Sequence, residues 1–170
     1  NSKISNKKIF KNIFVPPAVH DGGLSIGSAL ATYYNNLSKK RRMIYGNHTS
    51  LGLQGQKYYK KKNDSILYKY RNRIIYKKVK NPYRDIAKNL SNNKIVAVIF
   101  GKSEVGPRAL GSRSILADPR KKGNWLKVNR IKKREYWRPF APVIIEKYFH
   151  KYFSDSPKRT PFMLFTSKVK

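Results

Sequence analysis

The chain lacks cysteine, has few acidic residues and contains no long apolar run. The absence of cysteine among its 170 residues excludes disulfide frameworks, thiolate nucleophiles and cysteine-ligated zinc. No apolar run approaches the roughly 20 residues that a membrane-spanning helix needs. The chain starts with Asn1, and its opening stretch has no apolar core of a signal peptide. These absences predict a cytoplasmic protein, and we expect the chain to be a fragment of a longer one.

The charge balance is strongly basic. The sequence has 39 Lys+Arg against 8 Asp+Glu, which gives a formal net charge of +31. A basic surface binds nucleic acid by releasing counterions from the phosphate backbone. Lysines spread over a whole chain, often beside Asn, Ile and Tyr, are also typical of a biased codon supply in which lysine fills solvated positions. Hydrophobic residues at 39% and aromatics at 13% suffice for a packed core, so the charge does not indicate disorder.

The first half of the chain has weak secondary-structure patterns. The apolar run at 9–15, the glycines that follow Asp21 and the small residues after them predict a strand, a turn and a helix within 1–35. Two short segments, 66–70 and 74–76, have the composition of short strands. The basic runs around them have the composition of solvated linkers.

The second half is more strongly patterned. Apolar residues at helical spacing predict a short helix over 86–90, ended by Asn92. The continuous β-branched run 95–100 predicts a strand buried on both faces. It leads into Gly101, and polar residues just after the carboxyl end of a buried strand are a usual place for a site in an α/β sheet. We therefore predict an α/β fold.

The stretch 101–119 combines backbone-shaping residues with cations and hydroxyls. Three glycines and Pro107 shape a loop through which a ligand can approach the backbone. Arginine's planar fork suits phosphate or carboxylate, so the stretch has the composition of an anion site. An alternative is a surface loop in which Arg108 pairs with Glu104 or Asp118. The candidate anion-binding residues are Lys102, Ser103, Arg108, Ser112, Arg113 and Ser114.

A second stretch, 129–142, adds an asparagine and more arginines. Arg134 and Arg138 are four residues apart and would share a face if this segment were helical. Two prolines, Pro139 and Pro142, predict a rigid turn ahead of another apolar strand at 143–145.

These two stretches, 101–120 and 129–142, closely resemble the carboxyl-terminal half of the carbamoyltransferases of the NodU/CmcH type. The most specific part is the Gly-Pro-Arg-Ala-Leu-Gly motif at 106–111. The resemblance spans nearly the whole chain and is weakest across 36–82. Shorter matches lie at 13–18, 21–24 and 161–164.

The resemblance implies a two-domain architecture. The family joins an ATPase-like first domain of the actin/Hsp70 type to a second domain with the YrdC-like fold of threonylcarbamoyl-adenylate synthases. On this basis residues 1–35 are the tail of the first domain and 36–46 a linker. Residues 47–170 are then a YrdC-like domain, incomplete at its carboxyl end.

The resemblance also implies an activity. Such enzymes form carbamoyl-adenylate from carbamoyl phosphate and ATP in the second domain, then pass the carbamoyl group to a hydroxyl of a small molecule in the first. The family uses a divalent metal, Fe or Mg, held by histidines that lie well upstream. Because His20, His48 and His150 do not recreate that pair, we expect the chain to be inactive alone and to need the first domain or a separate chain as partner.

Site residues follow from the resemblance and from the charge of the ligands. Arg108 and Arg138 are expected to grip phosphate oxygens, and Asn129 to bond the carbamoyl amide. The resemblance implies that Asp21 is a ligand of the first domain's metal. The alternative is that Asp21 is a turn residue with no metal-binding role. The nucleotide and carbamoyl phosphate are expected to contact Lys102, Ser103, Arg113, Ser114 and Arg134, while Glu104 and Asp118 orient arginines.

Two other function classes remain open. Five tyrosines interleaved with basic residues are typical of a nucleic-acid-binding module, because their rings can stack on bases. The other class is a non-catalytic remnant that binds ligand or a partner chain. The tyrosines are Tyr58, Tyr59, Tyr68, Tyr70 and Tyr76.

Overall fold

A computed structural model describes residues 1–36, 49–52, 63–154 and 160–170. The chain divides into two compact units that alternate along the sequence. Each unit contains helices and one two-stranded antiparallel sheet, which confirms the predicted α/β class. The first unit draws on described residues within 1–52, 104–110 and 143–170, and the second on those within 53–103 and 111–142.

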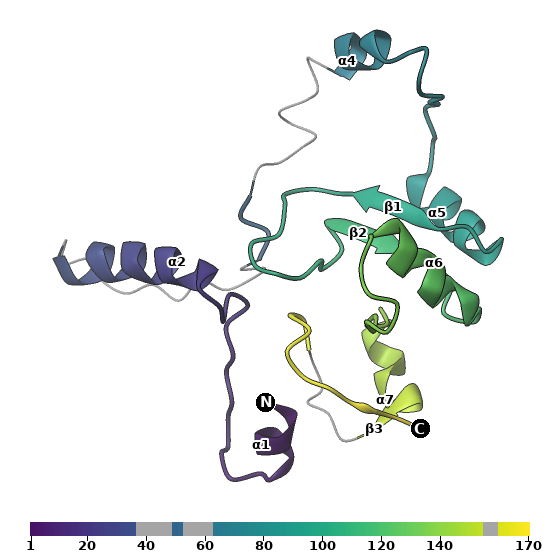
Figure 1. Cartoon of the computed structure of the whole chain (residues 1–170). Coiled ribbons are helices and arrows are strands. Elements are labelled where there is room, and N and C mark those ends of the chain that lie inside the picture. Colours follow the sequence, from purple (N-terminus) through teal and green to yellow (C-terminus); the bar gives the residue numbers. More distant parts are fainter. Residues whose placement is uncertain (37–48, 53–62, 155–159) are drawn as a thin grey trace. The chain divides into compact units, whose positions relative to one another are not determined.

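In the described part of the chain, the second unit contains three helices and one two-stranded sheet (Figure 1). Its elements are α4 (Asn63–Lys69), α5 (Pro82–Ser91), β1 (Val96–Ile99), β2 (Arg113–Leu116) and α6 (Gly123–Ile131).

Helix α5 has strong local signals at both ends. The Asn81 side chain accepts a hydrogen bond from the backbone N–H of Arg84, and Pro82 occupies the first turn, where its missing N–H costs nothing. The helix ends at Asn92, and Asn93 then adopts a left-handed conformation with φ of 61°. The predicted helix and its end at Asn92 are confirmed.

Strand β1 forms where the apolar run predicts it, but it is not buried on both faces. It pairs antiparallel with β2, with Val98 opposite Ser114 and Ile99 opposite Arg113. Val98 is buried, whereas Ile99 is 68% exposed. The prediction of burial on both faces is therefore wrong. A β-branched run indicates strand propensity, but the number of layers that cover the strand depends on the rest of the fold.

Unlike β1, four other predicted strands do not form. Residues 66–69 belong to α4 instead, because backbone hydrogen bonds between residues four apart form without any partner strand. Segments 9–15, 74–76 and 143–145 are irregular. A strand needs a pairing partner, and apolar composition alone does not supply one.

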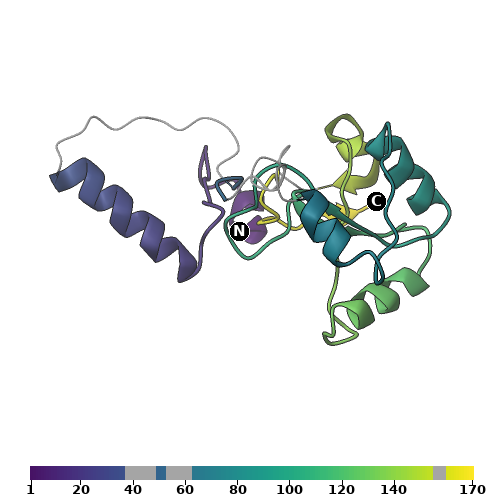
Figure 2. The same cartoon turned by 90° about the horizontal axis from the view of Figure 1, so that it is seen from above.

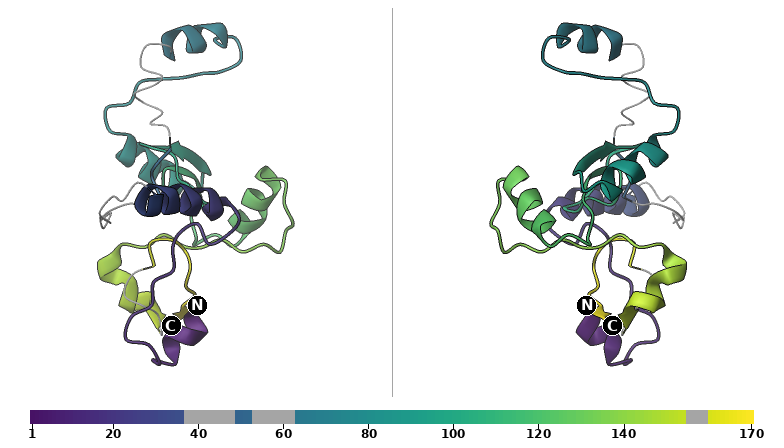
Figure 3. Two further views of the ribbon diagram at one scale, coloured as in Figure 1. Left: turned by 90° about the vertical axis from the view of Figure 1, so that its left-hand side faces the viewer. Right: turned by 90° about the vertical axis from the view of Figure 1, so that its right-hand side faces the viewer.

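The first unit holds both chain termini. The Asn1 side chain donates to the Leu164 carbonyl oxygen at 2.9 Å, and Ser2 hydrogen-bonds to Thr166, so the ends lie near each other (Figure 3). The predicted helix after Asp21 is confirmed as α2 (Gly22–Ala31), continued by the π-helix η1 (Thr32–Asn36) (Figure 2). The unit's elements are α1 (Ser2–Asn6), α2 (Gly22–Ala31), η1 (Thr32–Asn36), the 3₁₀ helix η2 (Glu146–Tyr148), α7 (Phe149–Tyr152), β3 (Phe153–Ser154) and β4 (Lys168–Val169).

Among the described residues, more polar than apolar residues are buried. Among the described residues, the buried apolar side chains are Val98 and Val128, while the buried polar residues are Thr49, Asp118, Asn124 and Asn129. The apolar run at 9–15 is open to solvent, with Phe14 76% exposed. None of the helices in the described part of the chain has the length and hydrophobicity that a bilayer crossing requires.

Candidate functional site

Asn129 organises the second of the two arginine-bearing stretches. It lies on α6 and is 1% exposed. Its Nδ2 donates to the carbonyl oxygens of Tyr136 and Arg138, both at 3.0 Å, and its Oδ1 accepts from Arg134 Nε at 2.5 Å. These three bonds hold residues 134–138 against the helix.

Arg134 and Trp125 complete this arrangement. The Arg134 guanidinium donates to the Pro139 carbonyl oxygen at 3.2 Å and lies 4.1 Å from the centre of the Phe140 ring. The indole N–H of Trp125, also on α6, donates to the Arg138 carbonyl oxygen at 2.6 Å. We call these contacts of Trp125, Asn129 and Arg134 with residues 134–140 the α6 latch. It forms entirely within the second unit.

The segment that carries the two arginines is not helical. Helix α6 ends at Ile131, and Lys133 has a left-handed φ of 48° that turns the chain back. Arg134 and Arg138 therefore do not share a helical face. The spacing of residues along a sequence does not indicate where a lysine adopts a positive φ. The four-residue interval between Arg134 and Arg138 therefore suggested a helix that does not form.

Arg138 presents its guanidinium at the surface. It is 50% exposed, and its Nε lies 2.6 Å from Glu135 Oε2. The pKa of Glu135 is lowered, first by a hydrogen bond from its own backbone N–H and then by the bond from Arg138. The carboxylate therefore stays ionised beside the arginine, and an incoming anion would compete with it for the guanidinium.

Arg113 and Ser114 are the first two residues of β2. Arg113 Nη1 donates to the carbonyl oxygens of Phe100 at 3.0 Å and Ser112 at 2.9 Å. Ser114 Oγ accepts from the backbone N–H of Gly111 at 3.0 Å. Gly111 has φ of 108°, which disfavours side chains. These bonds shape the ends of the glycine-rich stretch. Next to them, Lys102 is exposed and Ser103 is half-buried.

Arg108 belongs to a tight turn in the first unit. The turn is closed by Glu104 Oε1, which accepts from the backbone N–H of Leu110 at 2.9 Å, and by the Val105 N–H, which donates to the Thr49 carbonyl oxygen at 2.5 Å. Arg108 itself is exposed and, within the described ranges, has no hydrogen bond or ion pair. Since Arg108 and Arg138 belong to different units, their common pocket stays a prediction.

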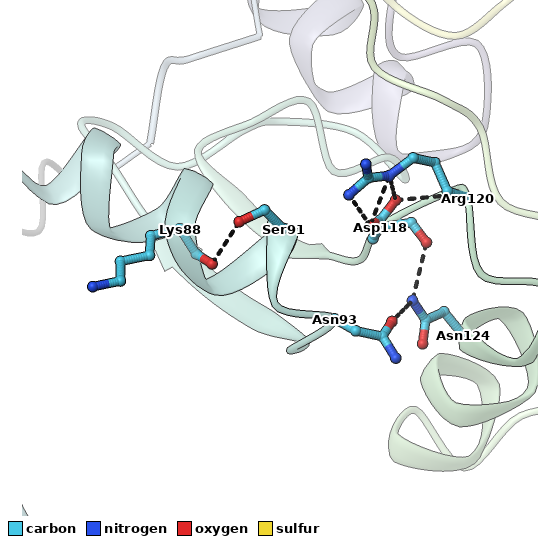
Figure 4. A network of polar contacts seen from close by, with 6 residues as sticks. All are labelled: Lys88, Ser91, Asn93, Asp118, Arg120 and Asn124. Carbon is cyan, nitrogen blue, oxygen red and sulfur yellow. Dashed lines mark hydrogen bonds and ion pairs between the residues drawn. The ribbon is translucent and has the colours of Figure 1, made fainter.

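Asp118 anchors a polar network that the sequence did not reveal in full (Figure 4). It is 5% exposed and paired with Arg120, whose Nη2 lies 2.7 Å from its Oδ2. Hydrogen bonds from the side chain and backbone N–H of Arg120 lower the pKa of Asp118 to about 2. Asn124 Nδ2 donates to the Asp118 carbonyl oxygen at 3.0 Å and to Asn93 Oδ1 at 2.8 Å.

This network shows that Asp118 does not pair with Arg108, which was one alternative, and confirms that it orients an arginine. That arginine is Arg120. Sequence reasoning overlooked Arg120, Asn124 and Trp125 as organising residues. The Asp-Pro-Arg spacing at 118–120 was the available signal, because an aspartate readily bonds the backbone two residues on.

Asp21 is the residue implied for a metal. It lies exposed before the first turn of α2 and makes no side-chain capping bond. Neighbouring His20 accepts the Gly22 N–H at its Nδ1, 3.0 Å away. No group of three potential ligands is present in the parts of the chain that the structure describes. Those residues alone thus do not fit a metal centre. His48 lies outside the described residues.

Comparisons with known proteins identify the carboxyl-terminal half. Residues 87–170 match the model of the family "Carbamoyltransferase C-terminus". The match includes both arginine-bearing stretches, the α6 latch and the Asp118 network.

Three relatives align with the whole chain. It is 35% identical to nodulation protein NolNO of Sinorhizobium fredii, 37% to the protein MJ1051 of Methanocaldococcus jannaschii and 32% to nodulation protein NolO of Bradyrhizobium diazoefficiens. The alignments cover 100% of this chain but 25%, 31% and 31% of the relatives, so the chain spans between a quarter and a third of their length. The family match and these alignments together show that the chain belongs to the carbamoyltransferase family.

Proposed function

We propose that this chain is part of an O-carbamoyltransferase that forms carbamoyl-adenylate from carbamoyl phosphate and ATP. The carbamoyl group then passes to a hydroxyl of a small molecule. The observation that carries the proposal is the family match over residues 87–170, which contains the two arginine-bearing stretches, 101–120 and 129–142. The rest of the enzyme, as a missing first domain or a separate chain, is the proposed partner.

The chemistry needs cations more than it needs acids or bases. Water converts carbamoyl phosphate to carbamate and phosphate, and a carbamate oxygen then attacks the α-phosphorus of ATP and displaces pyrophosphate. Transfer of the carbamoyl group to the hydroxyl releases AMP, so negative charge must be held throughout. Positioning and charge stabilisation are most of what a protein adds to such transfers. In the proposal, Arg108 and Arg138 hold phosphate oxygens. Asn129, predicted to bond the carbamoyl amide, is 1% exposed with its own amide bonded to Tyr136, Arg138 and Arg134, so it holds the segment that carries Arg138 instead. The surrounding contacts come from Lys102, Ser103, Arg113, Ser114 and Arg134.

The finer architecture is part of the same proposal. Residues 47–170 form a YrdC-like domain, and residues 1–35 are the tail of an actin/Hsp70-like domain joined through 36–46. The exposed apolar side chains of Ile9, Phe10 and Phe14 support this, because the remainder of such a domain would cover them. Asp21 would contribute to the divalent metal site, Fe or Mg, of the complete cytoplasmic enzyme.

Calorimetric titration of ATP and of carbamoyl phosphate into the chain tests the proposal. Arg108→Ala is expected to weaken binding about ten- to a hundredfold, the effect of losing one charge-assisted contact of about 1.5–3 kcal/mol. Arg108→Lys keeps the charge but loses the two-pronged geometry, so it also weakens binding.

The matched control is Arg73, which is exposed and lies outside the family match. Arg73→Ala and Arg73→Lys are expected to leave both affinities unchanged. If Arg73→Ala weakens binding as much as Arg108→Ala, the basic residues act as a diffuse field and the specific pocket is refuted.

A second candidate function, binding of single-stranded nucleic acid, is favoured by one observation. Tyr68 and Tyr76 are 66% and 61% exposed, and the Arg71 guanidinium lies 4.1 Å from the centre of the Tyr68 ring. Exposed rings beside cations are stacking platforms for bases. Tyr58 and Tyr59 lie outside the described residues.

Fluorescence anisotropy of a labelled oligouridine decides between the two functions. If the tyrosines stack on bases, Tyr68→Ala reduces affinity by about 1–3 kcal/mol. Under the carbamoyltransferase proposal, any binding falls steeply with salt and does not respond to Tyr68→Ala, because only charge contributes.

A further inference from the structure

Two side chains on one face of α6 hold the same backbone atom. Trp125 and Asn129 are four residues apart in the helix, so their side chains project from neighbouring turns of one face. Trp125 Nε1 and Asn129 Nδ2 both donate to the carbonyl oxygen of Arg138, at 2.6 and 3.0 Å. A carbonyl oxygen has two lone pairs, and here both have a donor.

The backbone on either side of that carbonyl is held as well. Asn129 Nδ2 also binds the carbonyl oxygen of Tyr136, and Arg134 binds that of Pro139. Three carbonyls between Tyr136 and Pro139 are thus held, two of them by side chains of α6 and one by Arg134, while the Arg138 guanidinium remains half exposed beside Glu135. This division separates the part of Arg138 that is fixed from the part that can meet a ligand.

We infer that Trp125 is a positioning residue for Arg138. Its indole N–H fixes the Arg138 carbonyl and with it the point from which the guanidinium reaches an anion. An arginine whose backbone is already held in place loses less conformational freedom when it binds an anion, so it binds the anion more tightly. The inference rests on the proposed function, in which Arg138 contacts the phosphate group of carbamoyl phosphate.

A double-mutant cycle isolates this role. Trp125→Phe removes the N–H but keeps an aromatic ring, and Arg138→Ala removes the guanidinium but keeps the backbone carbonyl. Carbamoyl phosphate is titrated calorimetrically into the wild-type chain, each single variant and the double variant. Trp125→Phe is expected to weaken binding about fivefold when Arg138 is present, the value of one neutral hydrogen bond. It is expected to have no effect when residue 138 is alanine, because no guanidinium remains to be aimed.

The outcomes separate the inference from the proposed function. If Arg138→Ala weakens binding but Trp125→Phe does not, or weakens it equally in both backgrounds, the positioning role is overturned and the proposed function stands. If Arg138→Ala itself leaves binding unchanged, the assigned role of Arg138 fails, and the positioning role fails with it.

A measurement on the wild-type chain keeps the inference falsifiable if a variant does not fold. Solvent exchange of the Trp125 indole proton, followed by NMR, is expected to be slow relative to a free indole because the proton is held by a carbonyl. The indole of Trp137, which is 61% exposed, is the internal comparison. Equal exchange at the two indoles overturns the inference.

Discussion

Asn129→Ala removes the centre of the α6 latch, and its cost follows from three hydrogen bonds. Two neutral bonds, to the carbonyls of Tyr136 and Arg138, contribute about 1 kcal/mol each, and the bond from the Arg134 guanidinium about 1.5–3 kcal/mol. Water will reach part of the freed groups, because the Arg134 end is near the surface. We therefore expect the free energy of unfolding to fall by about 3 kcal/mol, a large share of the 5–15 kcal/mol typical of a domain.

Urea denaturation followed by tryptophan fluorescence measures this loss, since Trp125 and Trp137 both lie within the latch. Asn92→Ala is the matched control: Asn92 is exposed, so the change should stay within about 0.5 kcal/mol. Asn129→Asp keeps the acceptor for Arg134 but loses both donors, and should lie between the two. If Asn129→Ala costs no more than Asn92→Ala, the latch does not stabilise the unit, and our account of the segment is refuted.

Three further predictions concern charge, backbone and packing. The pKa of Asp118 is lowered from 3.8 to about 2 by Arg120, so its stabilising effect is present above about pH 4 and disappears as the pH falls toward 2. A carbon-13 NMR titration should show this low pKa, and Arg120→Ala should raise it toward 3.8. Gly111→Ala should cost about 1–3 kcal/mol in thermal unfolding, because φ is 108° although a Cβ would have open space there. Gly27→Ala, in equally open space within α2, should instead stabilise by about 1 kcal/mol. Backbone amides at 9–15 should exchange with solvent almost as fast as in an unfolded peptide. Strong protection of these amides in a monomer would contradict the view that this segment packs only against another domain.

The family could be predicted from residues that carry chemistry, without any structure. The glycine, proline and arginine positions of 106–111 and 134–142 form an uncommon combination, and the comparisons confirm the family to which they point. The use of each residue was less predictable. Asn129 was expected to contact the carbamoyl group, yet in the structure its amide makes three bonds to its own chain. A sequence shows that an amide is present, but not which carbonyls will lie within its reach.

The sequence by itself determined the features that depend on neighbouring residues. Helix α5 begins at an asparagine cap followed by proline and ends at Asn92, and these signals act over one turn of the chain. The apolar run at 95–100 became β1 because β-branched residues favour extended backbone wherever a partner exists.

Only the tertiary structure decided features that depend on distant partners. It chose Arg113–Leu116 as the strand that pairs with β1, and it left Ile99 exposed instead of covering it. It brought the Val105 N–H to the carbonyl of Thr49 and the Trp125 indole to the carbonyl of Arg138. Such contacts form where the chain folds back on itself, and buried polar groups take whichever partner the fold brings within about 3 Å.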